Sequence, residues 1–276
     1  MLSFPNAKLN LGLYVTARRP DGYHELATSF VPLPWTDALE VLPAPKGQAA
    51  SSLSLTGRPI PGEPATNLCL KAYELLRADH PTLPPVQLHL HKIVPIGAGL
   101  GGGSADAAFA LRAISQVFAL GLTTEQLEPY ARRLGADCAF FLHNEPRLAH
   151  GRGDEFTPLA LPDLRGVPCL VVYPGLHIST AEAFAGIVPR PPAHPLREAL
   201  GQPMAAWREL VSNDFEAVLA PRYPVLADIK ARLYAAGATY ASLSGSGSAV
   251  YGLFPGLAEA PALPWEPEFL VWRGAL

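Results

Sequence analysis

Cysteine is scarce in this sequence, and the few cysteines form no recognisable pair. Cys69, Cys138 and Cys169 are the three cysteines among 276 residues, each lies in an apolar run, and none belongs to a CxxC motif. The chain therefore lacks the paired cysteines that hold small secreted proteins together. We interpret the three thiols as reduced core residues of a cytoplasmic protein.

Long apolar runs and strong net charge are also missing. No apolar run reaches membrane-spanning length, and the start MLSFPNAKLN lacks the charged and apolar stretches of a signal peptide. We therefore expect cytoplasmic localisation and no membrane partner. The formal net charge of −3 argues against a protein that coats nucleic acid. The sequence does not imply an oligomeric partner.

The chain is rich in apolar residues, and their periodicity indicates both strands and helices. Hydrophobic residues make up 49% of the chain, enough for a substantial core. Period-two and period-3.6 patterns occur in different segments. They predict strands over 7–15, 86–95 and 168–174, and helices over 67–79, 104–118, 123–135, 179–187 and 223–237. Together they favour an α+β fold with two lobes.

Three local patterns carry further expectations. The first strand alternates apolar with polar or small residues, which predicts one buried face, with Lys8 and Asn10 together on the opposite face. By that pattern alone, Lys8 is best read as solvated. The dipeptide Asp21-Gly22 predicts a tight turn after this strand. In the helix over 67–79, the spacing predicts a buried stripe of Leu68, Ala72, Leu75 and Leu76.

A run of glycines is the most informative feature of the sequence. In PIGAGLGGGSADAAFAL, residues 95–111, five glycines fall within the seven positions 97–103, directly before an alanine-rich segment. Backbone N–H groups of a glycine loop that opens a helix form an anion site, to which the helix dipole adds. The alternative is a flexible turn, for which one or two glycines would suffice. We therefore predict a phosphate-binding loop, with Ser104 near the helix N-cap.

The type of phosphate loop can be narrowed. A Walker A loop ends in Gly-Lys-Ser/Thr, whereas this run ends in Gly-Gly-Ser-Ala. Gly97, Gly99 and Gly102 fit a GxGxxG frame, but no acidic residue ends a second strand about 20 residues later, as a dinucleotide fold requires.

The run instead strongly resembles the ATP-binding motif of the GHMP kinases. Within that superfamily, the extra glycine and SADAA resemble the 4-diphosphocytidyl-2-C-methyl-D-erythritol kinases of the non-mevalonate route to isoprenoids. Other matching stretches span most of the chain: NAKLNLGLYV (6–15), RPDGYHEL (19–26), LGADCAFFL (134–142), HGRGDEFTPL (150–159), NDFE (213–216) and SGSGSAVYGLF (244–254). The chain departs from the family at Ala105, where serine is common, at Ala139, where proline is usual, and after Phe254, where the usual final helix is not evident.

The resemblance implies a GHMP kinase fold with the active site in a cleft between an ATP-binding domain (1–153) and a C-terminal domain (154–276). It implies transfer of the γ-phosphate of ATP to the 2-hydroxyl of 4-diphosphocytidyl-2-C-methyl-D-erythritol. Lys8 and Asp137 carry over as catalytic residues. The residues assigned to ATP are Asn67, Lys92, Pro95, Ile96, Gly97, Ala98, Gly99, Leu100, Gly101, Gly102, Gly103, Ser104 and Ala105. The residues assigned to the cytidine-linked substrate are Asn10, Tyr23, His24, Thr180, Phe184, Gly245 and Gly247.

Several of these residues also have plainer interpretations. Asp137 and Asn67 could simply cap the helices that follow them, and Lys92 could be an exposed strand residue. Phe184 has the spacing of a core residue. Gly245 and Gly247 are expected to let the backbone approach the substrate or the first glycine loop. No His, Cys and Asp cluster has metal-ligand spacing, so we expect Mg²⁺ to arrive with ATP.

Rival functions differ in what they require of these residues. One rival is another GHMP small-molecule kinase, of the homoserine or mevalonate type. The substrates of such kinases contain no nucleobase that could stack on Tyr23, His24 and Phe184. A ligand sensor that has lost catalysis would not need Lys8 and Asp137. A dinucleotide-dependent oxidoreductase is the most distant alternative.

Overall fold

The structure is a computed structural model that describes residues 1–276, the side chains of Pro64 and Pro162 excepted. It divides into two compact units. Unit 1 comprises residues 1–7, 35–96 and 101–144, and unit 2 comprises residues 8–34, 97–100 and 145–276. Each unit is thus assembled from segments far apart in the chain. The domain boundary expected after residue 153 stays a prediction.

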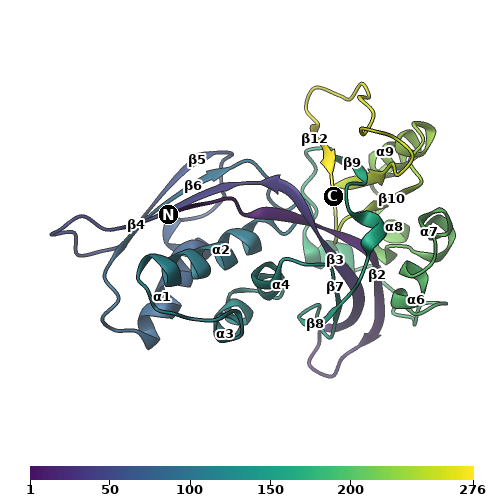
Figure 1. Cartoon of the computed structure of the whole chain (residues 1–276). Coiled ribbons are helices and arrows are strands. Elements are labelled where there is room, and N and C mark those ends of the chain that lie inside the picture. Colours follow the sequence, from purple (N-terminus) through teal and green to yellow (C-terminus); the bar gives the residue numbers. More distant parts are fainter. The chain divides into compact units, whose positions relative to one another are not determined.

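Unit 1 is a sheet with helices packed beside it. Its strands are β1 (Leu2–Ser3), β4 (Ala38–Pro43), β5 (Ser52–Gly57) and β6 (Val86–Lys92), in the order β1-β4-β6-β5. Strand β6 pairs antiparallel with β4 and parallel with β5. The helices are α1 (Leu68–Asp79), α2 (Gly102–Val117), α3 (Thr124–Leu134) and α4 (Cys138–His143). Helix α2 is central, because it contacts α1, α3, α4 and β4 (Figure 1).

Unit 2 contains two sheets. One has the order β2-β3-β7-β8, and most of β2 and β3 belongs to this unit. Its strands are β2 (Asn6–Arg18), β3 (His24–Thr36), β7 (Arg147–His150) and β8 (Glu155–Pro158). The other is antiparallel, in the order β10-β11-β9-β12. Its strands are β9 (Pro168–Tyr173), β10 (Tyr240–Leu243), β11 (Val250–Leu253) and β12 (Leu270–Ala275).

Short helices complete unit 2. They are α5 (Thr180–Phe184), α6 (Leu196–Leu200), α7 (Met204–Leu210), α8 (Asp214–Leu219) and α9 (Pro224–Ala235). Helix α9 contacts β10 and β11 (Figure 1). The core of this region joins residues of β9, β10 and β11 to residues of α8 and α9, with Phe215 and Leu233 among them. The α+β class is thereby confirmed.

Three expectations about the elements need correction. Strand β2 is buried on both faces from Asn6 to Val15, so the expectation of one buried face was wrong. Helix α2 begins at Gly102, two residues earlier than expected, because glycine tolerates both the helical turn and the bend before it. The buried stripe of α1 is Cys69, Ala72, Tyr73 and Leu76, so Leu68 and Leu75 were misassigned.

The remaining expectations about the elements mostly hold. The Asp21-Gly22 turn joins β2 to β3, with φ of 86° at Gly22. All three cysteines are buried, and none is in a disulfide. The tail lacks a final helix in the described structure but carries β12, which the sequence analysis missed. No helix in the described part of the chain is long and apolar enough to cross a bilayer.

Candidate active site

The second half of the glycine loop opens helix α2 in unit 1. The N-cap residue is Gly101, whose φ of 71° lies in the left-handed region that favours glycine. A Cβ added at Gly103 would meet no atom within 4 Å, so this side of the first turn is open. The first N–H groups of a helix have no partner within the helix, and they bind anions well. The loop therefore has the geometry of a phosphate site.

A buried cluster of three charges lies beneath this helix start. Lys92, at the end of β6, donates from Nζ to Asp37 and, at 2.7 Å, to Asp106 of α2. A Cβ at Gly102 would lie 2.9 Å from Nζ of Lys92, which shows how closely the ammonium approaches the helix start. Asp37 also accepts hydrogen bonds from the backbone N–H groups of Ile93 and Val94. The cluster thus fixes the chain on both sides of the glycine loop.

Burial controls the ionisation of this cluster. Burial raises the pKa of Asp106 to about 7, against the opposing charge of Lys92. Burial alone would lower the pKa of Lys92, but the two carboxylates outweigh it and raise that pKa. Two carboxylates share one ammonium, and Oδ1 of Asp106 has no hydrogen-bond partner in the described structure. The reading of Lys92 as an exposed strand residue was therefore wrong, since the side chain is 2% exposed.

Asp137 stands at the N-cap position of α4, also in unit 1. Its side chain makes no capping hydrogen bond to that helix, which argues against the plain capping interpretation. Cys138 follows Asp137 in the chain, and its thiol forms a hydrogen bond with the hydroxyl of Ser104 in α2. The starts of α2 and α4 are therefore adjacent within unit 1, and Asp137 directly precedes α4.

Other residues assigned to ATP have structural roles in unit 1. Asn67 is the N-cap of α1, and its side chain accepts a hydrogen bond from the backbone N–H of Cys69 at 2.9 Å. Ser104 is the third residue of α2, so it lies near the N-cap as expected, and the N-cap itself is Gly101. Ala105 is fully buried, and a side chain at this position faces the core. Pro95 and Ile96 connect the end of β6 to the loop, with Ile96 at the surface.

The first half of the glycine loop, Gly97 to Leu100, belongs to unit 2 and contacts Lys8. Nζ of Lys8 donates to Oδ1 of Asn10 at 2.5 Å and to the carbonyl oxygen of Gly99 at 2.9 Å. It also lies 4.8 Å from the ring centre of Phe30. Because β2 is buried on both faces, Lys8 is 3% exposed, and the solvated reading was wrong. Ala98 and Leu100 anchor the loop in the interior.

The second run of glycines contacts the first. A Cβ at Gly99 would lie 2.0 Å from the carbonyl oxygen of Ser244, and one at Gly245 would lie 3.1 Å from the carbonyl oxygen of Gly99. The hydroxyl of Ser244 donates to the Gly99 carbonyl at 2.9 Å. A Cβ at Gly247 would meet Leu243 and Ile178 instead. Gly245 therefore lets the backbone approach the first loop, which was one of the two expected roles, whereas the approach of substrate to Gly245 and Gly247 stays a prediction.

The residues assigned to the nucleobase are only partly gathered. The rings of His24 and Phe184 stack, with centroids 4.7 Å apart and planes at 16°. Phe184 also meets Phe215 edge-on, so it joins the core as its spacing suggested. Tyr23 is 57% exposed, and the guanidinium of Arg152 lies 5.1 Å from its ring centre. Thr180 is the first residue of α5 and is exposed.

Sequence reasoning missed the residues that support the two loops. Asp37 and Asp106 hold Lys92, and Asn213 and Glu216 hold the segment around Ser244. A carboxylate among the alanines of SADAA was the available signal for Asp106. Among the described residues, no group of three or more His, Cys, Asp and Glu side chains could hold a metal ion.

Comparisons with known proteins agree with this geometry. Two family models match the chain: "GHMP kinases N terminal domain" over residues 67–145 and "GHMP kinases C terminal" over residues 196–263. A solved homoserine kinase from Cytophaga hutchinsonii superposes with a TM-score of 0.67 at 17% identity, covering 98% of this chain and 94% of that one. At that identity the likeness concerns the fold. Fold and site thus define the class of the protein, which is a GHMP kinase.

The relatives narrow the class to one family. The 4-diphosphocytidyl-2-C-methyl-D-erythritol kinase of Bacteroides thetaiotaomicron is 48% identical over the full length of both chains. That of C. hutchinsonii is 48% identical over 92% of each. A crystal structure of 4-(cytidine 5'-diphospho)-2C-methyl-D-erythritol kinase has a TM-score of 0.79 at 36% identity, covering 92% of this chain and 90% of that one. The chain belongs to the 4-diphosphocytidyl-2-C-methyl-D-erythritol kinase family.

Proposed function

We propose that the protein transfers the γ-phosphoryl group of ATP to the 2-hydroxyl of 4-diphosphocytidyl-2-C-methyl-D-erythritol. The products are ADP and the 2-phosphate, an intermediate on the non-mevalonate route to isoprenoid precursors. The observation that carries this proposal is 48% sequence identity, over the full length of both chains, to a 4-diphosphocytidyl-2-C-methyl-D-erythritol kinase. The glycine loop at the start of α2 supports it independently, because it has the geometry of a phosphate site.

ATP binds through the glycine loop in this proposal. The N–H groups at the start of α2 receive the phosphates at the open side of Gly103, and the helix dipole adds to the attraction. In this proposal Asn67 and Lys92 support ATP binding indirectly, by holding the starts of helices in place. Asn67 fixes the start of α1, and Lys92 fixes the start of α2 from below.

Asp137 and Lys8 act on the transfer step. Asp137 accepts the proton of the substrate hydroxyl as its oxygen forms the new bond to phosphorus and the bond to the β-phosphate oxygen breaks. Lys8 offsets the negative charge on the transferring group. Its ammonium is held in place by Asn10 and by the Gly99 carbonyl, so it is already oriented before substrate arrives.

The cytidine half of the substrate is recognised by aromatic residues. Tyr23 and Phe184 stack on the base, and His24 hydrogen-bonds to its edge. His24 covers one face of Phe184, so a base that stacks on this face must displace the imidazole ring. Thr180 adds a polar contact from the start of α5, and Gly245 and Gly247 let the substrate approach the backbone.

Mg²⁺ enters with the nucleotide. The described residues form no ligand set for a resident metal ion, so the phosphates of ATP would carry it. When bound, it would neutralise phosphate charge, and the protein residues discussed above position the reacting groups.

The test is ATP consumption with cytidine-linked and unlinked acceptors. We expect turnover with 4-diphosphocytidyl-2-C-methyl-D-erythritol, and none above background with 2-C-methyl-D-erythritol 4-phosphate, homoserine or mevalonate. Equal turnover with homoserine or mevalonate would overturn the substrate assignment. Single-turnover transfer by folded Asp137→Asn should be slower by about 10²-fold or more. A wild-type rate in that variant would remove Asp137 from the mechanism.

A further inference from the structure

The turn that touches the first glycine loop is itself held by residues of helix α8. This turn, Ser244 to Ser248, connects β10 to β11. Its internal hydrogen bonds are few: Gly247 N–H donates to the Ser244 carbonyl, and Ser244 N–H donates to the Ala249 carbonyl. A turn that contains two glycines with positive φ has little stiffness of its own. Its position must therefore be fixed from outside.

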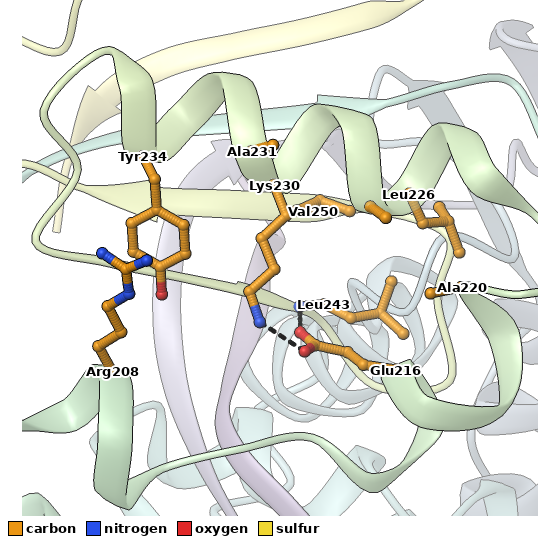
Figure 2. Close-up of a pocket in the computed structure, with 10 residues that line it drawn as sticks. Arg208, Glu216, Ala220, Leu226, Lys230, Ala231, Tyr234, Leu243 and Val250 are labelled. Carbon is orange, nitrogen blue, oxygen red and sulfur yellow. Dashed lines mark hydrogen bonds and ion pairs between the residues drawn. The ribbon is translucent and has the colours of Figure 1, made fainter.

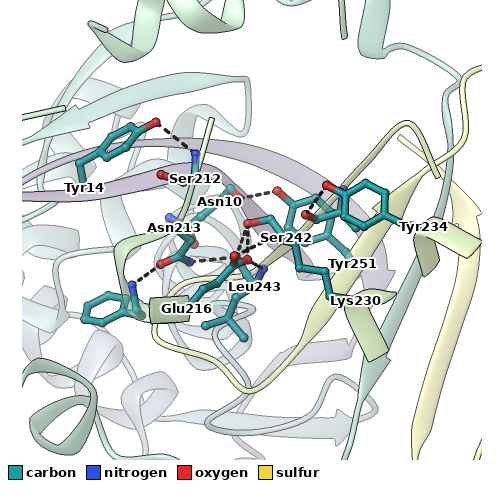
Figure 3. Close-up of polar contacts among 12 residues, drawn as sticks. Asn10, Tyr14, Ser212, Asn213, Glu216, Lys230, Tyr234, Ser242, Leu243 and Tyr251 are labelled. Atoms are coloured by element: carbon teal, nitrogen blue, oxygen red, sulfur yellow. Dashed lines mark hydrogen bonds and ion pairs between the residues drawn. The ribbon is translucent and has the colours of Figure 1, made fainter. Parts of the chain in front are cut away.

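Asn213 supplies that support at the start of the turn, and at its end the Ser248 hydroxyl donates to the Leu176 carbonyl oxygen. Its side chain is 2% exposed, and Nδ2 donates to the carbonyl oxygens of Leu243 and Gly245, both at 2.9 Å. Oδ1 accepts from the backbone N–H of Phe215 and so caps α8. Both amide protons are thus used to hold the start of the turn, while the oxygen ties the same residue to the helix (Figure 3).

Glu216 holds the strand just before the turn. Oε1 accepts hydrogen bonds from the backbone N–H of Leu243 at 2.7 Å and from the Ser242 hydroxyl at 3.0 Å. Oε2 accepts from Nζ of Lys230 at 2.5 Å. This ion pair lies in a pocket of about 510 Å³ whose walls include Arg208, Tyr234 and Val250 (Figure 2). Asn213, the N-cap of α8, and Glu216, in its first turn, therefore both hydrogen-bond to the segment from Ser242 to Gly245.

The turn held by Asn213 and Glu216 is in turn hydrogen-bonded to residues assigned to catalysis. The Ser244 hydroxyl donates to the Gly99 carbonyl, which also accepts from Lys8. The same hydroxyl accepts from the backbone N–H of Asn10 at 3.3 Å. A displaced Ser244 would free the Gly99 carbonyl to move, and this carbonyl accepts one of the hydrogen bonds that orient the Lys8 ammonium.

We propose that Asn213 is a positioning residue for phosphoryl transfer: its amide fixes the Ser244–Ser248 turn, and the turn orients Lys8 through Ser244 and Gly99. Glu216 reinforces this hold from the strand side. The inference rests on the proposed function, in which Lys8 acts on the transferring group. Small misplacements of such groups are costly, because the reacting geometry tolerates little error.

The decisive variant is Asn213→Ser. Serine is a good N-cap and keeps the helix start, but it cannot reach both carbonyls with two donors. We expect kcat to fall by about 10- to 100-fold, whereas KM for ATP changes by less than about threefold, because in the proposed function the phosphates bind at the start of α2, which Asn213 does not contact. Asn213→Asp, which also caps but faces the two carbonyls with negative charge, should lose at least as much. Circular dichroism and a thermal midpoint above the assay temperature establish that each variant is folded.

The matched control lies one residue along the helix. Asp214 accepts a hydrogen bond from the backbone N–H of Val15, and in the described structure its side chain makes no hydrogen bond to the turn. Asp214→Asn therefore exchanges a carboxylate for an amide and leaves the contacts of the turn in place. It should keep kcat within about twofold of wild type. An equal loss in Asp214→Asn, or a wild-type kcat in Asn213→Ser, would overturn the proposal.

Amide hydrogen exchange separates this inference from the proposed function. Exchange at residues 244–248 should accelerate in Asn213→Ser and not in Asp214→Asn, whatever reaction the protein catalyses. If the wild type does not phosphorylate the cytidine substrate, the proposed function fails, and this exchange difference still decides whether Asn213 holds the turn. Unchanged exchange in Asn213→Ser would refute the hold directly.

Discussion

The two glycine-rich turns of this protein are supported by different chemistry. The start of α2 rests on a buried ammonium between two carboxylates, Lys92 with Asp37 and Asp106. Within the Ser244–Ser248 turn, the Gly245 carbonyl is held by a neutral amide, that of Asn213. Both supports are almost completely excluded from water.

Buried charges and a buried amide differ in what they require in order to be stable inside a protein. Buried charges must be desolvated, and they stay stable only while their partners are complete. A buried amide requires only that its hydrogen bonds be satisfied, and those of Asn213 are. The charged support should therefore be the more fragile and the more sensitive to pH, whereas the neutral support should act mainly on geometry.

Removing the ammonium should give the largest effect. Lys92→Met leaves Asp37 and Asp106 buried without their shared cation, which typically costs about 3–5 kcal/mol of unfolding free energy. Urea unfolding measures the loss. Lys71→Met, at an exposed position of α1, is the matched control and should stay within about 0.5 kcal/mol of wild type. A loss in Lys92→Met no larger than in the control would show that the cluster does not support the fold.

Disturbing the contact between Gly99 of the first glycine loop and Ser244 should come next. In Gly99→Ala the new Cβ would lie 2.0 Å from the Ser244 carbonyl oxygen, at a φ of 77° that alanine tolerates poorly. Strain and overpacking together should cost about 2–4 kcal/mol by urea unfolding.

Gly103→Ala is the control for this clash. Its Cβ meets open space, and alanine is the better helix former, by about 1 kcal/mol. The variant should therefore be as stable as wild type or more so. If the phosphates lie at this open side, calorimetry should nevertheless show weaker ATP binding in Gly103→Ala. Undiminished ATP affinity would argue against phosphate at this position.

The pH dependence of Asp106 sharpens the comparison between charged and neutral support. Burial raises the pKa of Asp106 to about 7 from an ordinary 3.8, so the folded protein binds this proton more tightly than the unfolded chain does. The resulting stabilisation is complete below pH 3.8 and is lost as the pH rises through 7. Lys92, Asp37 and Cys69 are the charged and titratable groups that act on this carboxyl.

Asp106→Asn should remove that pH-dependent term. Between pH 5 and pH 8 the wild type should lose on the order of 2–3 kcal/mol of unfolding free energy that the variant does not lose. Asn213→Ser is the counterpart from the neutral support, and its difference from wild type should be the same at both pH values. A parallel pH profile for Asp106→Asn and wild type would contradict the raised pKa.

Local patterns predicted five of the nine α-helices and three of the twelve strands in the described structure, because periodicity and helix caps depend on neighbouring residues. The helix over 123–135 matches α3 (Thr124–Leu134), and the strand over 86–95 matches β6. Burial was harder to foresee, because it depends on what covers an element. Strand β2 has an alternating pattern, yet both of its faces are covered. The same limit misplaced Lys8 and Lys92 in their plain readings, since each ammonium is buried by partners distant in the chain.

In the candidate site, too, local features could be predicted from the sequence and long-range contacts could not. The glycine loop could be predicted, because a phosphate site made of backbone N–H groups is a local feature. The supports could not, because Asp37 and Lys92 are 55 residues apart, and Asn213 and Gly245 are 32 apart. No spacing rule connects such pairs. Their partners become visible only when the chain is folded.

The smallest expected effect concerns Asn67, whose two interpretations make different predictions. As the N-cap of α1 it accepts from the Cys69 N–H, so Asn67→Ala should cost about 1 kcal/mol of unfolding free energy. Asn67→Ser restores a capping oxygen but shortens the side chain, so it should recover that stability. If Asn67 also contacts the adenine of ATP, Asn67→Ser should still bind ATP more weakly than wild type, measured by calorimetry. If Asn67→Ser matches wild type in both stability and ATP affinity, capping alone accounts for this residue.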